Sequence, residues 1–297
     1  MSSSQTILIT GCSSGFGLLA AKELARSGHT VYATMRAVDG KNADRATELR
    51  SVADDEGLSL HVLELDVTSD ASVEQAVAAV IEAEGAIDTV VNNAGVMPVG
   101  VTEAFTVEQL QANLDVNLVG PFRVVRTVAP HMRAAGSGLI VQVSTIAGRM
   151  AVPFFGVYHA SKWGLEGMSE ALRYELSGKG IDVVVIEPGP FTTNLFPEAP
   201  SPADEERLLG YEVENQTLVE MGQAFEALFE DSDVPTDPQI LVDTMVRVIE
   251  TPAGERPFRT TGGVDFGVAE WNAAADDFRI SILQGFGLEH MEGVRTQ

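Results

Sequence analysis

Tyr158 and Lys162 are two side chains of this sequence whose types and spacing point directly to chemistry. They are four residues apart, so on a helix they lie on the same face. A phenol has a pKa of about 10 and exchanges protons poorly near neutral pH. A neighbouring ammonium group favours the phenolate and lowers that pKa. The pair therefore predicts a general acid/base that gives a proton to a carbonyl oxygen or takes one from an alcohol.

Ser144 is expected at the end of a strand, because it closes the apolar run of residues 138–144. There its hydroxyl can bind a substrate oxygen and stabilise the charge that develops on it. His159 follows Tyr158 but lies on a different helical face, and we interpret it as structural. Ser144 and His159 do not indicate a hydrolase, because the strand-elbow motif G-x-S-x-G is absent around the serine.

A glycine-rich segment, T-G-C-S-S-G-F-G at residues 10–17, lies between a predicted strand at 7–10 and a predicted helix at 17–27. Glycines let the chain turn sharply and let its backbone approach a pyrophosphate at a helix N-terminus. The spacing differs from G-x-G-x-x-G, but the mechanism is the same. The alternative is a tight turn without a ligand. The residues of this predicted dinucleotide site are Gly11, Ser13, Ser14, Gly15, Phe16 and Gly17.

Strand-like and helix-like segments alternate through much of the chain. Strands are expected at residues 7–10, 30–35, 60–65, 89–92, 138–144 and 182–187, and helices at 17–27 and 73–84. Ser72 is expected to open the second helix. Because the strands are apolar on both faces, they predict a parallel sheet covered on both sides. The fold class is therefore α/β, with a doubly wound parallel sheet in a single domain over residues 1–297.

Residues 193–238 interrupt this alternation. They are acidic, punctuated by prolines, and helical from 205 to 229, with Met221, Phe225 and Phe229 at amphipathic spacing. We interpret this segment as an insertion before the last strand that forms a lid over a substrate site. A helix at 239–250, a strand at 258–261 and a C-terminal extension at 262–297 complete the domain.

The order of these motifs resembles that of the short-chain dehydrogenase/reductase family. The loop T-G-x-x-x-G-x-G is followed by Asn92-Asn93-Ala94-Gly95, Ser144, Tyr158-x-x-x-Lys162 and Pro188-Gly189. The likeness covers residues 5–195 closely. It implies a Rossmann-like fold of about seven parallel strands. It also implies hydride exchange with a nicotinamide cofactor and no metal. The positive nicotinamide of the oxidised cofactor would act together with the Lys162 ammonium to lower the pKa of Tyr158.

The resemblance implies a role for each matching residue. It places Ser144, Tyr158 and Lys162 in the catalytic set, with Asn117 holding a water that links Lys162 to solvent. Lys162 would also bind the ribose of the nicotinamide half. Helices near 103–133 and 157–178 would pair copies into a homodimer or homotetramer. The remaining implied cofactor contacts are Asp66 and Val67 at the adenine, Asn93, Ala94 and Gly95 in the cleft, and Pro188, Gly189, Phe191 and Thr193 at the nicotinamide.

The choice of cofactor depends on the end of the second predicted strand. NAD-dependent enzymes place an acidic residue there to hold the ribose hydroxyls. Here that position is Met35, followed by Arg36, whose guanidinium can bind a 2′-phosphate in bidentate fashion. Ser14 departs from the second basic residue that some NADP-dependent relatives carry. An ordinary surface arginine is the alternative, but the pattern favours NADP(H) over NAD(H).

The segments that follow the strand ends are apolar and predict the substrate class. Such walls favour a hydrophobic ketone, aldehyde or secondary alcohol over a sugar or an acidic metabolite. Arg149 offers an alternative anchor for a substrate carboxylate. The phrase V-Y-A-T-M-R at 31–36 is similar to hydroxysteroid and retinol dehydrogenases of the family. The predicted substrate-pocket residues are Val96, Met97, Met150, Phe154, Phe155 and Phe196.

Composition excludes several classes of partner. The net charge is −24, with 43 acidic against 19 basic residues, so a phosphate-binding surface for nucleic acid has the wrong sign. No uncharged apolar stretch reaches the ~18 residues that cross a bilayer, and no signal peptide is evident, so we expect a soluble cytoplasmic protein. Cys12 is the only cysteine, which excludes an intrachain disulfide and a four-cysteine zinc site.

Two other functions stay open at this point. A lyase-type relative such as a halohydrin dehalogenase would replace the lysine with arginine and degrade the glycine loop, whereas Lys162, Gly11 and Gly15 are intact. A non-catalytic NADP-sensing regulator need not keep a complete serine, tyrosine and lysine set. The intact set therefore favours an oxidoreductase over both.

Overall fold

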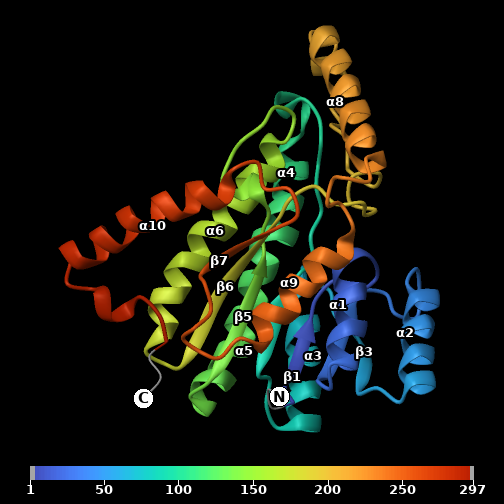
Figure 1. Cartoon of the computed structure of the whole chain (residues 1–297). Helices are drawn as coiled ribbons and strands as arrows, with labels where there is room; N and C mark the ends of the chain where they lie inside the picture. Colours follow the sequence, from blue (N-terminus) through green and yellow to red (C-terminus); the bar gives the residue numbers. More distant parts are fainter. Residues whose placement is uncertain (1–3, 295–297) are drawn as a thin grey trace.

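The computed structural model describes residues 4–294 and contains a seven-stranded sheet in the order β3-β2-β1-β4-β5-β6-β7 (Figure 1). All six neighbouring pairs are parallel. The strands are β1 (Thr6–Ile9), β2 (Thr30–Met35), β3 (Leu60–Glu64), β4 (Thr89–Asn92), β5 (Gly138–Val143), β6 (Ile181–Pro188) and β7 (Arg259–Gly262). Every residue of β6 is buried, as a parallel strand covered on both faces should be.

Helices cover both faces of the sheet. One layer consists of α1 (Gly15–Arg26), α2 (Ala43–Glu56) and α9 (Pro238–Glu250), and the other of α3 (Asp70–Glu84), α5 (Gly120–Ala135) and α6 (Gly156–Ser177). Leu24 and Leu49 are fully buried in the first layer, and Val128 is fully buried in the second. Each such side chain contributes about 1.5–3 kcal/mol relative to an exposed one. The predicted doubly wound α/β fold in a single domain is confirmed.

The strand order reverses between β1 and β4, and this reversal determines where a ligand can bind. The chain leaves β1 toward β2 on one side, whereas β4 continues toward β5 on the other. Loops that diverge in this way leave a crevice beyond the carboxyl ends of the strands. The glycine-rich loop after β1 and the segment after β4 lie side by side there.

Helix α4 (Val107–Leu114) continues into α5 through a π-helical turn, η2 (Asp115–Val119). The α4 N-terminus is fixed by a capping box in which Thr106 and Gln109 satisfy each other's backbone N–H groups. The π turn carries Asn117, which is fully buried. Such turns occur frequently at functional positions because they redirect one side chain within a continuous helix.

Two sequence predictions about helices were wrong in detail. Ser72 does not open α3: Ser69 is the N-cap and accepts from the Ser72 N–H at 3.3 Å. The Ser72 hydroxyl instead accepts from the Asp66 N–H at 3.0 Å. The helix expected at 205–229 is divided into α7 (Glu205–Leu208) and α8 (Glu212–Glu230), and Gly210, a poor helix former, lies at the break.

Two helices extend away from the sheet layers in Figure 1: α8, and α10 (Val268–Gly285) near the C-terminus. Every residue of α8 is at least partly exposed. Between residues 4 and 294, no helix combines the length and apolarity that a membrane span requires. The same part of the chain contains no group of three or more His, Cys, Asp or Glu side chains arranged to hold a metal.

Candidate functional site

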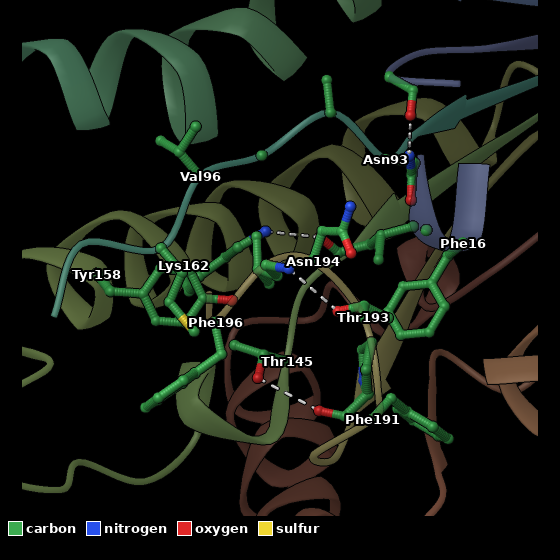
Figure 2. Close-up of a pocket in the computed structure, with 18 of the residues that line it drawn as sticks. Phe16, Asn93, Val96, Thr145, Tyr158, Lys162, Phe191, Thr193, Asn194 and Phe196 are labelled. Carbon is green, nitrogen blue, oxygen red and sulfur yellow. Dashed lines mark hydrogen bonds between the residues drawn. The ribbon is translucent and has the colours of Figure 1, made fainter. Parts of the chain in front are cut away.

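A cavity of about 420 Å³ lies at the carboxyl edge of the sheet, where the strand order reverses. The loops after β1 to β6 and the insertion before α9 line it. In Figure 2, Phe16 and Phe191 lie together at one end, with ring centres 5.3 Å apart. Tyr158, Lys162 and Phe196 lie at the other end (Figure 2).

The glycine-rich loop is cross-linked to the segment after β4. Gly11 has φ +73°, and a Cβ there would lie 2.7 Å from the Cα of Ala94, so only glycine fits. The Thr10 hydroxyl accepts from the N–H groups of Asn93 and Ala94, each at 3.0 Å. Asn93 Nδ2 donates to Thr10 O at 2.9 Å. The two loops therefore form a rigid backbone cradle.

The N-terminus of α1 opens into this cradle. Ser14 is the N-cap in an extended conformation, and its hydroxyl makes no capping hydrogen bond in the described chain. The first N–H groups of a helix lack intrahelical partners and favour an anion. Gly17 lies outside the cavity lining, but a Cβ there would come within 2.4 Å of Asn93 Nδ2, so it lets α1 pack against the asparagine. These features fit the pyrophosphate of a dinucleotide.

Arg36 and Asp66 also line the cavity. Burial opposes ionisation of Asp66, but hydrogen bonds from Thr68 and the positive charge of Arg36 outweigh it and lower its pKa. Arg36 is exposed. Its loop is fixed by Glu64, which accepts from the N–H groups of Ala37 and Val38 at 2.7 and 2.8 Å. The backbone that carries Arg36 is thus fixed at the end of β2, where the sequence predicted this arginine.

Tyr158 and Lys162 lie on α6 and both line the cavity. Burial raises the pKa of the Tyr158 phenol above its usual value, and Thr145 opposes this shift. The lowered pKa expected from the sequence combined Lys162 with the positive nicotinamide of a bound oxidised cofactor; in the protein's own groups alone, desolvation of the buried phenol dominates. Burial lowers the pKa of Lys162 to about 8, and Glu166 opposes that change.

Ser144 follows β5 and also lines the cavity. Its Oγ is buried and has no hydrogen-bond partner among residues 4–294. Lys162 Nζ donates to the carbonyl of Val143, the residue before Ser144, at 2.8 Å. An unpartnered hydroxyl in a buried cavity favours a ligand oxygen, since a buried polar group without a partner costs about 1–3 kcal/mol. Ser144, Tyr158 and Lys162, which the sequence singled out separately, are therefore brought to one cavity.

Asn117 lies beside this cavity but not in its lining. Its Nδ2 donates to Val96 O at 2.8 Å and to Ser161 Oγ at 3.0 Å, and its Oδ1 accepts from Val96 N–H at 2.9 Å. It thus fixes the chain after β4 against α6.

The structure brings most of the predicted residues to the cavity. The predicted residues found in the lining are Gly11, Ser13, Ser14, Gly15, Phe16, Arg36, Asp66, Val67, Asn93, Ala94, Gly95, Val96, Met97, Ser144, Met150, Phe155, Tyr158, Lys162, Pro188, Gly189, Phe191, Thr193 and Phe196. Gly17, Asn117 and Phe154 lie outside it.

Phe154 does not reach the cavity because of its backbone conformation. It has φ +71°, its carbonyl accepts from the Gly100 N–H at 2.8 Å, and its ring packs against the cluster of Val99 and Phe155. Arg149 is also absent from the lining, so its alternative role as a substrate anchor is not supported. Both residues follow Ser144 in sequence, but the turn after β5 directs them elsewhere.

Several lining residues were not assigned to the site from sequence. Phe225 and Phe229 of α8 join the apolar wall, and the Phe225 ring lies 5.6 Å from that of Phe196. Their four-residue spacing was recognised as amphipathic, and this was the available signal. Thr145 and Phe266 also line the cavity, and Phe266 has φ +50°, which no local pattern predicts.

Comparisons with known proteins agree with this geometry. Residues 5–203 match the family described as short chain dehydrogenase. The chain is 39% identical over 191 residues to 3-ketodihydrosphingosine reductase of Bacteroides thetaiotaomicron, covering 64% of this chain and 65% of that protein. It is 38% identical over 194 residues to human retinol dehydrogenase 8, covering 64% and 60%. Each match thus spans less than two thirds of the relative's length.

A solved structure extends the likeness over nearly the whole chain. A short-chain dehydrogenase from Streptomyces avermitilis superposes with a TM-score of 0.72 at 28% identity, covering 96% of this chain and 97% of that one. The cradle after β1, the grouping of Ser144, Tyr158 and Lys162 in one cavity and the family match lead to one conclusion: the chain belongs to the short-chain dehydrogenase/reductase family of oxidoreductases.

Proposed function

We propose that this protein transfers hydride between NADP(H), in preference to NAD(H), and a hydrophobic ketone, aldehyde or secondary alcohol. The observation that carries the proposal is the unpartnered Ser144 Oγ, which lines the same cavity as Tyr158 and Lys162. A carbonyl or alcohol oxygen bound by Ser144 would give this hydroxyl its missing partner and meet the phenol that exchanges the proton.

Tyr158 is the general acid/base. Because burial favours the neutral phenol, Tyr158 is suited to donate its proton to a carbonyl oxygen during reduction. Lys162, fixed by the Val143 carbonyl, stabilises the phenolate that remains. In the oxidation direction, the Tyr158 phenolate accepts the alcohol proton and becomes the neutral phenol. The bound nicotinamide cofactor supplies or accepts the hydride.

The proposed preference for NADP(H) rests on Arg36. Its guanidinium lines the cavity at the end of β2, where a carboxylate would repel a 2′-phosphate. Asn42 Nδ2 donates to Arg36 O at 2.6 Å, and Glu64 fixes the next two residues. This arrangement presents the guanidinium on a fixed backbone, which favours bidentate binding of a phosphate.

The substrate end supports an apolar molecule. Met97, Phe155 and Phe196 form its wall with Phe225 and Phe229 of α8. The names of two relatives include hydrophobic substrates, namely a ketodihydrosphingosine and retinol. We infer that residues 193–238 act as a lid, with the aromatic face of α8 closing over the substrate. Asn117 is proposed as a positioning residue that keeps Val96 in this wall.

A homodimer or homotetramer is the proposed assembly. The helices expected at the contacts carry exposed apolar side chains, namely Val107 on α4, Phe122 on α5 and Trp163 on α6. Apolar side chains that are exposed in a single copy favour burial against a second copy. Gel filtration with light scattering distinguishes a dimer or tetramer from a monomer.

The test is turnover of NADPH and NADH with hydrophobic aldehydes, cyclic ketones and ketosteroids. Tyr158→Phe should lower turnover by at least about 100-fold while NADPH binding stays within about twofold. Tyr174→Phe, on the same helix, is the matched control and should leave turnover unchanged. Equal loss in both variants, or none in Tyr158→Phe, would contradict the proposed mechanism. Tight NADPH binding without turnover across the panel would favour a non-catalytic NADP-sensing regulator.

A further inference from the structure

A buried amide links helix α10 to the loop that carries Ser144. Arg149 directly follows the short turn η3 (Ile146–Gly148), and its Nε donates to Asn272 Oδ1 at 2.8 Å. Asn272 Nδ2 donates to Glu187 Oε2 at 2.5 Å. An arginine can only donate, so the amide oxygen must face Arg149 and the amide nitrogen must face the carboxyl group. Asn272 is 7% exposed and Glu187 is fully buried.

The same network continues beneath the catalytic helix. Arg259 Nε donates to Glu166 Oε2 at 2.9 Å and lies 3.7 Å from Glu187 Oε1. Glu166 is one helical turn after Lys162 on α6. A Cβ built at Gly148 would lie 2.7 Å from Ser144 Oγ and 3.1 Å from Glu166 Cγ. The serine loop, the end of β6 and the catalytic helix therefore meet at one buried polar cluster.

The loop after Ser144 has separate anchors on its two sides. Toward α6, His159 Nδ1 lies 2.7 Å from Ala147 O, and His159 Nε2 accepts from the Val152 N–H at 2.9 Å. Toward the C-terminal extension, its anchor is the contact between Arg149 and Asn272. Asn272 lies outside residues 5–203, which match the family. The second anchor is thus supplied by a part of the chain that the family match does not cover.

We propose that Asn272 is a positioning residue, which holds the loop from Ser144 to Met150 through Arg149 and so keeps Ser144 Oγ in the cavity wall. Its consequence for turnover rests on the proposed function. A misplacement of about 1 Å at a catalytic group can cost up to about 100-fold in rate. Without the amide of Asn272, the partly buried guanidinium of Arg149 loses its acceptor and the buried Glu187 loses its donor. Because unsatisfied buried polar groups cost free energy, we expect the loop to rearrange.

The kinetic test compares Asn272→Leu, Arg149→Met and the double variant. Each single change should lower kcat for carbonyl reduction by about tenfold and leave the dissociation constant of NADPH within about twofold. Because both act on one contact, the double variant should be no slower than the slower single variant. Trp271→Leu, the exposed neighbour on α10, is the matched control and should leave kcat unchanged. Unchanged kcat in Asn272→Leu, or losses that multiply in the double variant, would overturn the proposal.

Hydrogen exchange tests the same contact without turnover. The N–H groups of Gly148 and Arg149 donate to Thr145 O and Ile146 O at 2.8 and 3.0 Å within the turn after Ser144. Asn272→Leu and Arg149→Met should each speed their exchange by about tenfold and leave the β1 amides unchanged. Exchange equal to that of the unaltered protein would overturn the anchor. Faster exchange in a protein that reduces no carbonyl would contradict the proposed function alone.

Discussion

Lys162 Nζ lies 5.9 Å from the centre of the Tyr158 ring and donates to the carbonyl of Val143, one residue before Ser144. This contact ties α6 to the end of β5. The ammonium is thereby held near the phenol without a hydrogen bond to it. A change at Lys162 should therefore affect the proton chemistry of Tyr158 and the stability of the site in separable ways.

The pH dependence of carbonyl reduction should report on Lys162. Its pKa is about 8, so the ammonium loses its proton as pH rises through that value and no longer stabilises the Tyr158 phenolate. We expect kcat/KM for the carbonyl to fall by about tenfold per pH unit above about pH 8. Lys162→Arg should remove this alkaline limb, because arginine keeps its charge. Lys179→Arg serves as the control and should keep the alkaline fall in kcat/KM. The same fall in the unaltered protein, Lys162→Arg and Lys179→Arg would contradict its assignment to Lys162.

Lys162→Met should stabilise the protein at pH 7 while removing activity. Burial lowers the pKa of Lys162 from 10.5 to about 8, so below pH 8 the folded state bears the full cost of a buried ammonium. That cost is about 3 kcal/mol, offset by about 1 kcal/mol for the hydrogen bond to Val143. The free energy of unfolding should rise by about 2 kcal/mol at pH 7, and less at pH 10. Urea denaturation at pH 7 and pH 10 measures this free energy of unfolding. A lower value for Lys162→Met than for the unaltered protein at pH 7 would refute the cost assigned to the buried ammonium.

Arg36→Ala should change the cofactor preference. Loss of a charge-assisted bond to a 2′-phosphate costs about 1.5–3 kcal/mol, so kcat/KM for NADPH should fall by about 10-fold to 100-fold. The value for NADH should stay within about twofold, since NADH carries no 2′-phosphate. Arg133→Ala, an exposed arginine of α5, is the control. Equal losses of kcat/KM for NADPH and NADH would show that Arg36 supports the fold and does not bind the 2′-phosphate.

Phe225→Ser should weaken binding of bulky substrates. Phe225 lies 5.6 Å from Phe196 and lines the apolar end of the cavity. Losing an aromatic contact of this size should raise KM for a large hydrophobic ketone by about tenfold and leave a small ketone unaffected. Val219→Ser, at a position of α8 that is 54% exposed, is the matched control. The same rise in KM for the large and the small ketone would contradict the proposal that α8 closes over the substrate.

The sequence was sufficient for the parts of the site that depend on local pattern. Strand β2 was predicted with its observed bounds because its apolar run has clear ends, and Tyr158 and Lys162 share a helix as their spacing required. Ser144 was placed because it ends an apolar strand, and such positions meet at one edge of a parallel sheet.

The features that were missed depend on long-range contacts or unusual backbone. Phe154 and Phe266 adopt positive φ, which no propensity of phenylalanine predicts, so one was wrongly assigned to the cavity and the other was overlooked. The contact of Arg149 with Asn272 joins residues 123 positions apart, and sequence spacing carries no information about it.

The central claim, direct hydride transfer with proton exchange at Tyr158, is tested by following a label from cofactor to product. NADPH carrying deuterium at C4 of the nicotinamide is incubated with the protein and a hydrophobic ketone, and the alcohol is examined by mass spectrometry. We expect deuterium on the carbinol carbon from one of the two labelled C4 epimers, and no measurable product from Tyr158→Phe on the same timescale. Alcohol without deuterium from either epimer, or labelled alcohol formed at an unchanged rate by Tyr158→Phe, would contradict the claim.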